Sequence, residues 1–99
     1  MSYLAFVSIT PIGKKESVSE EVAKAFKIIQ KSGLEFQLTA MGTIIESENI
    51  DQLFQVIKDA ISEVEKENNR VSVLLKIDCR KGKSNRIQEK VDSVLKKIQ

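Results

Sequence analysis

The side chains able to carry acid–base or nucleophilic chemistry in this chain are few. The candidates are Glu46, Lys76, Asp78 and Cys79, because the sequence contains no histidine. That absence removes the usual general base near neutral pH and the Ser-His and Cys-His nucleophile pairs. An enzyme using the four candidates would need a carboxylate or a lysine whose pKa is strongly shifted inside a pocket. No pattern requires such a group, so we expect a protein that is not an enzyme, with an unidentified small-molecule enzyme as an alternative.

Charge and composition narrow the classes of partner. The 16 Lys and Arg residues nearly match the 14 Asp and Glu residues, so no overall field attracts nucleic acid. The acidic residues are scattered without the spacing of a calcium or magnesium loop, and we expect no metal and no other cofactor. No stretch approaches the roughly 18 apolar residues of a membrane helix, and the first residues lack the basic flank of a signal peptide. With Cys79 as the only cysteine, these features predict a cytoplasmic protein without a disulfide and without a membrane partner.

The length of 99 residues predicts one domain over positions 1–99, since two cores of half that size would each be unstable. Tyr3–Ile9 is apolar and β-branched and precedes a proline and a glycine, which indicates a strand and then a loop. Ser17 and Glu20 form a capping-box pattern that begins a helix. Gly33 suits the left-handed conformation that closes this helix near Ser32. Its predicted apolar face consists of Val18, Val22, Ala25, Phe26 and Ile29.

In the middle of the chain, the spacing of apolar residues changes from helical to alternating. Apolar and polar residues alternate from Leu34 to Thr39, which predicts a half-buried strand. Gly42 interrupts the pattern before a strand at 43–47, so we expect a hairpin with a tight turn or bulge there. Asn49 is placed to cap the next helix. The predicted apolar stripe of that helix is Leu53, Phe54, Ile57, Ala60, Ile61 and Val64.

The last third of the chain predicts one strand and one helix. Alternation returns over 71–78, and a polar turn at 81–84 follows. The final helix carries Ile87, Val91, Val94, Leu95 and Ile98.

The resulting order β-α-β-β-α-β with an extra C-terminal helix is that of a ferredoxin-like α+β sandwich. Right-handed crossovers give an antiparallel sheet of order 4-1-3-2, numbered along the chain, with two helices on one face. The other face is open, and such a face predicts self-association into a homodimer or homotetramer. From the first strand, either Leu4, Phe6, Ser8 and Thr10 or the opposite set lies on the open face. The other residues predicted on it are Gln37, Thr39, Glu46, Leu74, Lys76 and Asp78.

Four sequence blocks occur together in an order and spacing that indicate a known family. They are Pro11-Ile12-Gly13 with Ser17-Val18-Ser19, Met41-Gly42-Thr43-Ile44-Ile45-Glu46, Arg70-Val71, and Lys76-Ile77-Asp78-Cys79-Arg80. Over nearly the whole chain they resemble the small thiamine-binding proteins of the YkoF-like superfamily. The resemblance implies a ferredoxin-like subunit that assembles into dimers and tetramers and binds thiamine or its hydroxymethylpyrimidine part.

An aminopyrimidine of this kind calls for a carboxylate or amide partner beside an apolar plate. Glu46 is predicted to supply the carboxylate, and the strand order places Ser8 or Thr10 between Glu46 and Lys76 on the open face. Thr43 belongs to the block that resembles the family's Met-Gly-Thr element. The predicted ligand-binding residues are Glu46, Thr43, Ser8, Thr10, Gln37, Thr39, Lys76 and Phe6.

Simpler interpretations stay open for these residues. Glu46 and Lys76 could be an interstrand charge network that fixes an oligomer. Phe6 and Phe36 could be core residues and not stacking plates. The basic run at 80–83, with Arg86 nearby, could hold a phosphate at the start of the last helix or be a solvated turn. For the whole protein, the alternative to ligand binding is a regulatory or structural oligomeric subunit without a small-molecule ligand.

Overall fold

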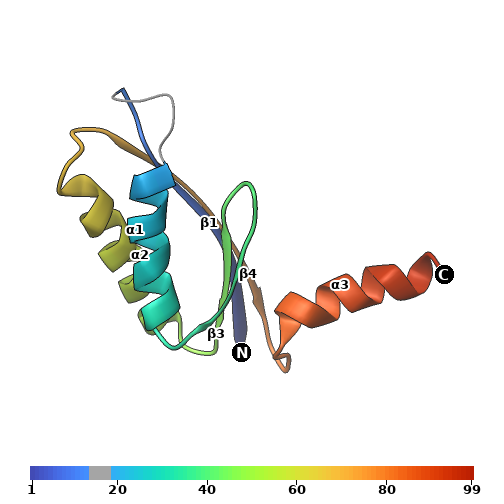
Figure 1. The fold of residues 1–99 in the computed structure, drawn as a ribbon. Helices are drawn as coiled ribbons and strands as arrows, with labels where there is room; N and C mark the ends of the chain where they lie inside the picture. Colours follow the sequence, from blue (N-terminus) through green and yellow to red (C-terminus); the bar gives the residue numbers. More distant parts are fainter. Residues whose placement is uncertain (14–18) are drawn as a thin grey trace.

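The computed structural model describes residues 1–13 and 19–99, and the elements follow the predicted order (Figure 1). The strands are β1 (Ser2–Pro11), β2 (Glu35–Leu38), β3 (Thr43–Ser47) and β4 (Val71–Arg80), and the helices are α1 (Ser19–Lys31), α2 (Ile50–Glu65) and α3 (Arg86–Lys97). The sheet is antiparallel in the order β2-β3-β1-β4, which is the predicted order taken from the other edge. The ferredoxin-like α+β fold with an added C-terminal helix is confirmed.

One face of the sheet is covered by α1 and α2 (Figure 1). Along β1 the buried positions alternate with partly exposed ones, so successive side chains point to opposite faces. Ala5 pairs with Ile45 of β3 and Ile77 of β4, and all three belong to the helix-covered side. The buried apolar core consists of Ala5, Val7, Ile9, Ala25, Ile29, Ile45, Leu53, Val56, Ile57, Ala60 and Val64.

The same register resolves the alternative left open for β1. Because Ala5, Val7 and Ile9 face the helices, the intervening residues lie on the open face. Those residues are Leu4, Phe6, Ser8 and Thr10.

The helix ends show how local sequence sets local structure. Asn49 accepts a hydrogen bond from the Gln52 backbone N–H at 3.1 Å, which confirms the predicted cap of α2. Gly33 follows α1 with φ +83°, the left-handed conformation expected there. The structure begins α1 at Ser19, and the predicted capping residue Ser17 lies outside the described residues.

The predicted apolar stripe of α2 was wrong at one position. Phe54 is 47% exposed, whereas Val56 is buried. A buried stripe recurs every three or four residues, and from Leu53 it continues through Val56 and Ile57, so Phe54 falls about a quarter-turn outside it.

Helix α3 projects away from the rest of the molecule beyond the end of β4 (Figure 1). Four of its five predicted apolar residues are exposed, with Val94 at 60% and Ile98 at 73%, whereas Ile87 is half-buried. Of the helices in the described part of the chain, none is both long enough and apolar enough to cross a membrane.

Candidate functional site

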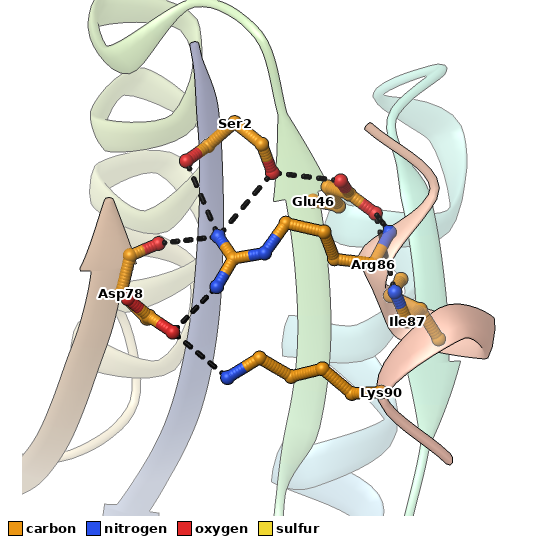
Figure 2. Close-up of polar contacts among 6 residues, drawn as sticks. All are labelled: Ser2, Glu46, Asp78, Arg86, Ile87 and Lys90. Atoms are coloured by element: carbon orange, nitrogen blue, oxygen red, sulfur yellow. Dashed lines mark hydrogen bonds and ion pairs between the residues drawn. The ribbon is translucent and has the colours of Figure 1, made fainter. Parts of the chain in front are cut away.

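Glu46 lies in a buried polar cluster where α3 leaves the sheet (Figure 2). The Ser2 hydroxyl donates to Glu46 Oε2 at 2.8 Å. The backbone N–H groups of Arg86 and Ile87 donate to Glu46 Oε1 at 2.8 and 3.3 Å. Both carboxylate oxygens therefore accept hydrogen bonds from the chain itself.

The Glu46 carboxylate acts as the cap of α3. Asn85, the residue before this helix, has φ 52° and makes no side-chain capping bond. The first backbone N–H groups of a helix carry partial positive charge and need acceptors. For α3, strand β3 supplies the acceptor, which is the Glu46 carboxylate. Two interpretations were left open for the start of the last helix, a phosphate site and a solvated turn, and the Glu46 carboxylate occupies the place in which a phosphate would accept from these N–H groups.

Arg86 ties the cluster to β1 and β4. Its side chain is 3% exposed, and its guanidinium donates to the Ser2 carbonyl at 3.4 Å, to the Asp78 carbonyl at 3.0 Å and to the Asp78 carboxylate. Lys90 of α3 donates to the same carboxylate at 2.8 Å. The Lys90 and Arg86 hydrogen bonds hold the pKa of Asp78 below its ordinary value of 3.8. The basic residues Arg86 and Lys90 thus both bind the carboxylate of Asp78.

A cavity of about 220 Å³ lies at the opposite end of β3, where β1 and α1 face the β2–β3 turn. Apolar residues and residues that carry a hydroxyl dominate its lining, and no charged side chain is among the described residues that line it. Four of the predicted ligand residues are included: Ser8, Thr10, Thr39 and Thr43. Thr43 is buried on the helix side of the sheet, and no described residue hydrogen-bonds its hydroxyl.

The β2–β3 turn forms one wall of this cavity. The Thr39 hydroxyl donates to the Gly42 carbonyl at 2.8 Å and accepts from the Met41 and Gly42 N–H groups at 3.3 and 3.2 Å. A Cβ at Gly42 would lie 2.6 Å from the ring of Phe6 and 2.8 Å from the Val7 carbonyl oxygen. Gly42 is therefore required by the close approach of β1, which refines the predicted tight turn.

The cavity opens where β1 continues past the end of β3. The pairing of these strands ends at Val7 and Thr43, while β1 runs on to Pro11 against β4. This unpaired edge was not among the predicted site residues, although the unequal lengths of the two predicted strands indicate it.

The other predicted ligand residues lie on the open face. Leu4 stands opposite Glu46, and Phe6 stands opposite Lys76, so Ser8 and Thr10 do not lie between Glu46 and Lys76 as predicted. The reason is the register, which places the two hydroxyl residues beyond the end of β3.

Lys76 lies beside a second, smaller cavity of about 160 Å³ on this face. Among the described residues of one chain, none forms a hydrogen bond or ion pair with Lys76, so Glu46 and Lys76 do not pair within a single chain. Gln37 lies on the same face, on the edge strand β2, opposite Ile44. The structure thus places four of the eight predicted residues at the lining of the first cavity and the other four across the open face, toward which the side chains of Ser8 and Thr10 also point. Phe36, on the helix-covered side, packs edge-on against Phe26 with ring centroids 5.4 Å apart.

The sheet order, the helix placement and the two cavities define a small α+β protein of the ferredoxin-like class. The sequence profile of a family described as "Thiamine-binding protein" matches residues 5–95. The chain belongs to this family.

Individual relatives are similar to this chain over nearly its whole length. The chain is 41% identical over 91 residues to the UPF0045 protein MJ1052 of Methanocaldococcus jannaschii, covering 92% of this chain and 90% of the relative. A crystal structure of that hypothetical protein superposes with a TM-score of 0.86, 40% identity, and coverage of 94% and 95%. The UPF0045 protein YqgV of Bacillus subtilis is 39% identical, covering 97% of each chain. A proposed thiamine biosynthesis/salvage protein of Thermotoga maritima shares the fold at 20% identity, with a TM-score of 0.82 and coverage of 95% and 99%.

Proposed function

We propose that this protein binds thiamine or its hydroxymethylpyrimidine part, without transforming it, in the cavity between α1 and the β2–β3 turn. The observation that carries the proposal is a cavity with no charged side chain among its described lining residues and with Thr43 on its helix side, in a chain of the thiamine-binding family. Ligand sites are mostly apolar with a few polar groups that orient the ligand, and this lining has that character. The role would be to carry, sequester or deliver the ligand inside the cytoplasm.

Size and charge favour the pyrimidine part as the buried portion. The cavity of about 220 Å³ is smaller than the roughly 300–1,000 Å³ of sites for drug-sized ligands, so it suits a single substituted ring. A thiazolium cation or a phosphate buried there would find no opposite charge among the described lining residues, and burying an unpaired charge is costly. The charged parts of thiamine or its phosphates would therefore extend out of the cavity.

The lack of a catalytic arrangement supports a binding role. Glu46 and Asp78 accept hydrogen bonds from Ser2, Arg86 and Lys90, and the pKa of Asp78 is lowered and not raised toward neutrality. Lys76 and Cys79 lie on opposite faces of β4, because they are three positions apart in a strand. The four candidate chemical groups do not converge.

Calorimetric titration with hydroxymethylpyrimidine, thiamine and thiamine phosphate tests the proposal. We expect saturable binding, weakened about tenfold by Thr43→Val, which removes one hydroxyl while keeping the side-chain shape. Glu46→Gln serves as the matched variant on the open face and should leave the affinity unchanged. If Glu46→Gln weakens binding and Thr43→Val does not, the ligand lies on the open face. If no compound binds, the proposed function is wrong.

A structural oligomeric subunit is the second candidate, and the exposed stripe of α3 favours it. Val91, Val94, Leu95 and Ile98 are 46–73% exposed on a helix that projects from the body. Such apolar stripes are usually buried against a partner. We propose a homodimer or homotetramer in which α3 and the open face take part. Light scattering coupled to size-exclusion chromatography should give that mass, and Val94→Asp should reduce it to the mass of one chain; a monomeric native protein would contradict it.

A further inference from the structure

The edge of β1 beyond the end of β3 carries backbone groups that face the cavity. In an antiparallel sheet, the N–H and C=O of one residue point to the same neighbouring strand, and successive residues alternate between neighbours. The Ile12 N–H donates to the Arg70 carbonyl at 2.9 Å, so Ile12 points toward the β4 side. Three residues earlier, Ile9 must point the other way, toward the side of β3.

A second observation gives the same orientation. A Cβ on Gly42, in the turn before β3, would lie 2.8 Å from the Val7 carbonyl oxygen, so Val7 faces that side. Val7 is paired with Thr43 in the register, and this is the last pair between the two strands. Ile9 is two residues further along β1, so its backbone N–H and C=O point to the same side as those of Val7. On that side, Ile9 has no strand partner among residues 1–13 and 19–99.

The Ile9 peptide groups lie at the wall of a partly open cavity. Ile9 lines this cavity, while the residue as a whole is 7% exposed and belongs to the core between the sheet and the helices. A backbone N–H and C=O in such a place require hydrogen-bond partners. Because the side chain is anchored, the two groups keep a fixed spacing and direction, which is what discriminates between similar ligands.

We infer that Ile9 recognises the ligand through its backbone, by pairing with a neutral heterocycle that carries an amino group next to a ring nitrogen. The inference rests on the proposed function and specifies the ligand class. The ring nitrogen accepts from the Ile9 N–H, and the amino group donates to the Ile9 carbonyl, as a neighbouring strand would. This pairing explains how an uncharged cavity selects a pyrimidine without a carboxylate.

Two ligand probes test the inference. We compare 4-amino-5-hydroxymethyl-2-methylpyrimidine with the analogue that carries hydrogen in place of the amino group. The analogue leaves the Ile9 carbonyl buried and unpaired, so its affinity should be about ten- to a hundredfold lower. In ¹⁵N-labelled protein, the Ile9 amide proton should shift downfield on binding the parent compound. Equal affinities, or an unmoved Ile9 amide, would overturn the inference while leaving the proposed function standing.

A pair of variants tests the protein side. Ile9→Pro removes the N–H that faces the cavity without removing a bond to β4, because Ile9 does not point to that strand. Ile9→Ala keeps the N–H and removes more of the side chain than Ile9→Pro does, so it controls for the loss of side-chain packing. We expect Ile9→Pro to bind the parent compound at least tenfold more weakly than Ile9→Ala, and equal affinities would contradict the inference. If Ile9→Pro does not fold, the two ligand probes decide alone. If the parent compound does not bind the native protein, the proposed function and this inference fall together.

Discussion

The two ends of β3 carry polar groups in opposite states. At the Glu46 end, the carboxylate accepts from Ser2, Arg86 and Ile87, so its hydrogen bonds are made within the chain (Figure 2). At the Thr43 end, a hydroxyl and the edge of β1 face a cavity of about 220 Å³ without such partners among the described residues. The first end joins α3 to the sheet, and the second is where a ligand would supply what the chain does not.

The comparison of the two ends of β3 indicates that the charged residues of this protein are not its ligand-binding residues. The charged residues attracted attention in the sequence, yet two of them, Glu46 and Asp78, are occupied in holding α3. Buried polar groups are normally paired within the protein, so the hydrogen bonds of Glu46 and Asp78 indicate a structural role for both carboxylates. The comparison predicts that variants at the Glu46 end change stability more than binding, and that variants at the Thr43 end affect binding.

The largest expected effect on stability is that of Arg86→Met. The substitution keeps an apolar stem but removes the guanidinium, so the Ser2 and Asp78 carbonyls each lose one donor and the ion pair with the Asp78 carboxylate is lost. We expect a loss of about 3 kcal/mol in the free energy of unfolding, measured by urea denaturation. Ligand affinity of the folded variant should equal that of the native protein.

Arg80→Met is the matched control for Arg86→Met. Arg80 is exposed at the end of β4, so the same substitution there should change the free energy of unfolding by less than about 0.5 kcal/mol. A similar loss from both variants would mean that the cluster at Arg86 contributes no more than an ordinary surface arginine.

The next effect is expected from Gly42→Ala, which joins stability to binding. Its Cβ would lie 2.8 Å from the Val7 carbonyl oxygen, and a backbone group cannot move aside as a flexible side chain can. We expect a loss of about 2 kcal/mol in the free energy of unfolding. Because the turn forms a cavity wall, calorimetry should also show weakened binding. The double variant with Phe6→Leu relieves only the ring contact, so restored stability would show that the carbonyl contact is unimportant.

The fold was predictable because its signals are local. The period of two over 71–78 and the Asn49 cap each lie within a few residues of the structure that they determine, and the structure confirms both. The Glu46 cluster was not predictable in this way, because Glu46 and Arg86 are 40 residues apart. A helix cap supplied from a distant strand leaves no pattern in the neighbouring sequence.

The candidate site was predictable only in part. Thr43 was selected by resemblance and Thr39 by its place in the alternating pattern, and the structure places both at one cavity. The Ile9 edge could not be selected by residue type, because backbone groups are the same at every position. Its availability follows from where β3 stops, and strand ends are among the least certain features of a sequence-based prediction.

A smaller effect is expected from Glu46→Gln, which sharpens the comparison directly. The amide oxygen can still accept at the start of α3, but the negative charge that suits a helix N-terminus is lost. We expect a loss of about 1 kcal/mol in the free energy of unfolding, with unchanged ligand affinity. Unchanged stability together with weakened binding would reverse the roles of the two ends of β3.

The smallest effect is expected from acid, and it concerns the attachment of α3. The Lys90 and Arg86 hydrogen bonds lower the pKa of Asp78, so its stabilising contribution is fully present above the ordinary value of 3.8 and is lost as the pH falls through the lowered pKa. Since the carboxylate is partly exposed, the contribution is modest. We expect the amide signals of α3 to change before those of β1 as the pH is lowered below 3.8. In Asp78→Asn this early change should disappear, and its persistence would assign the transition to another group.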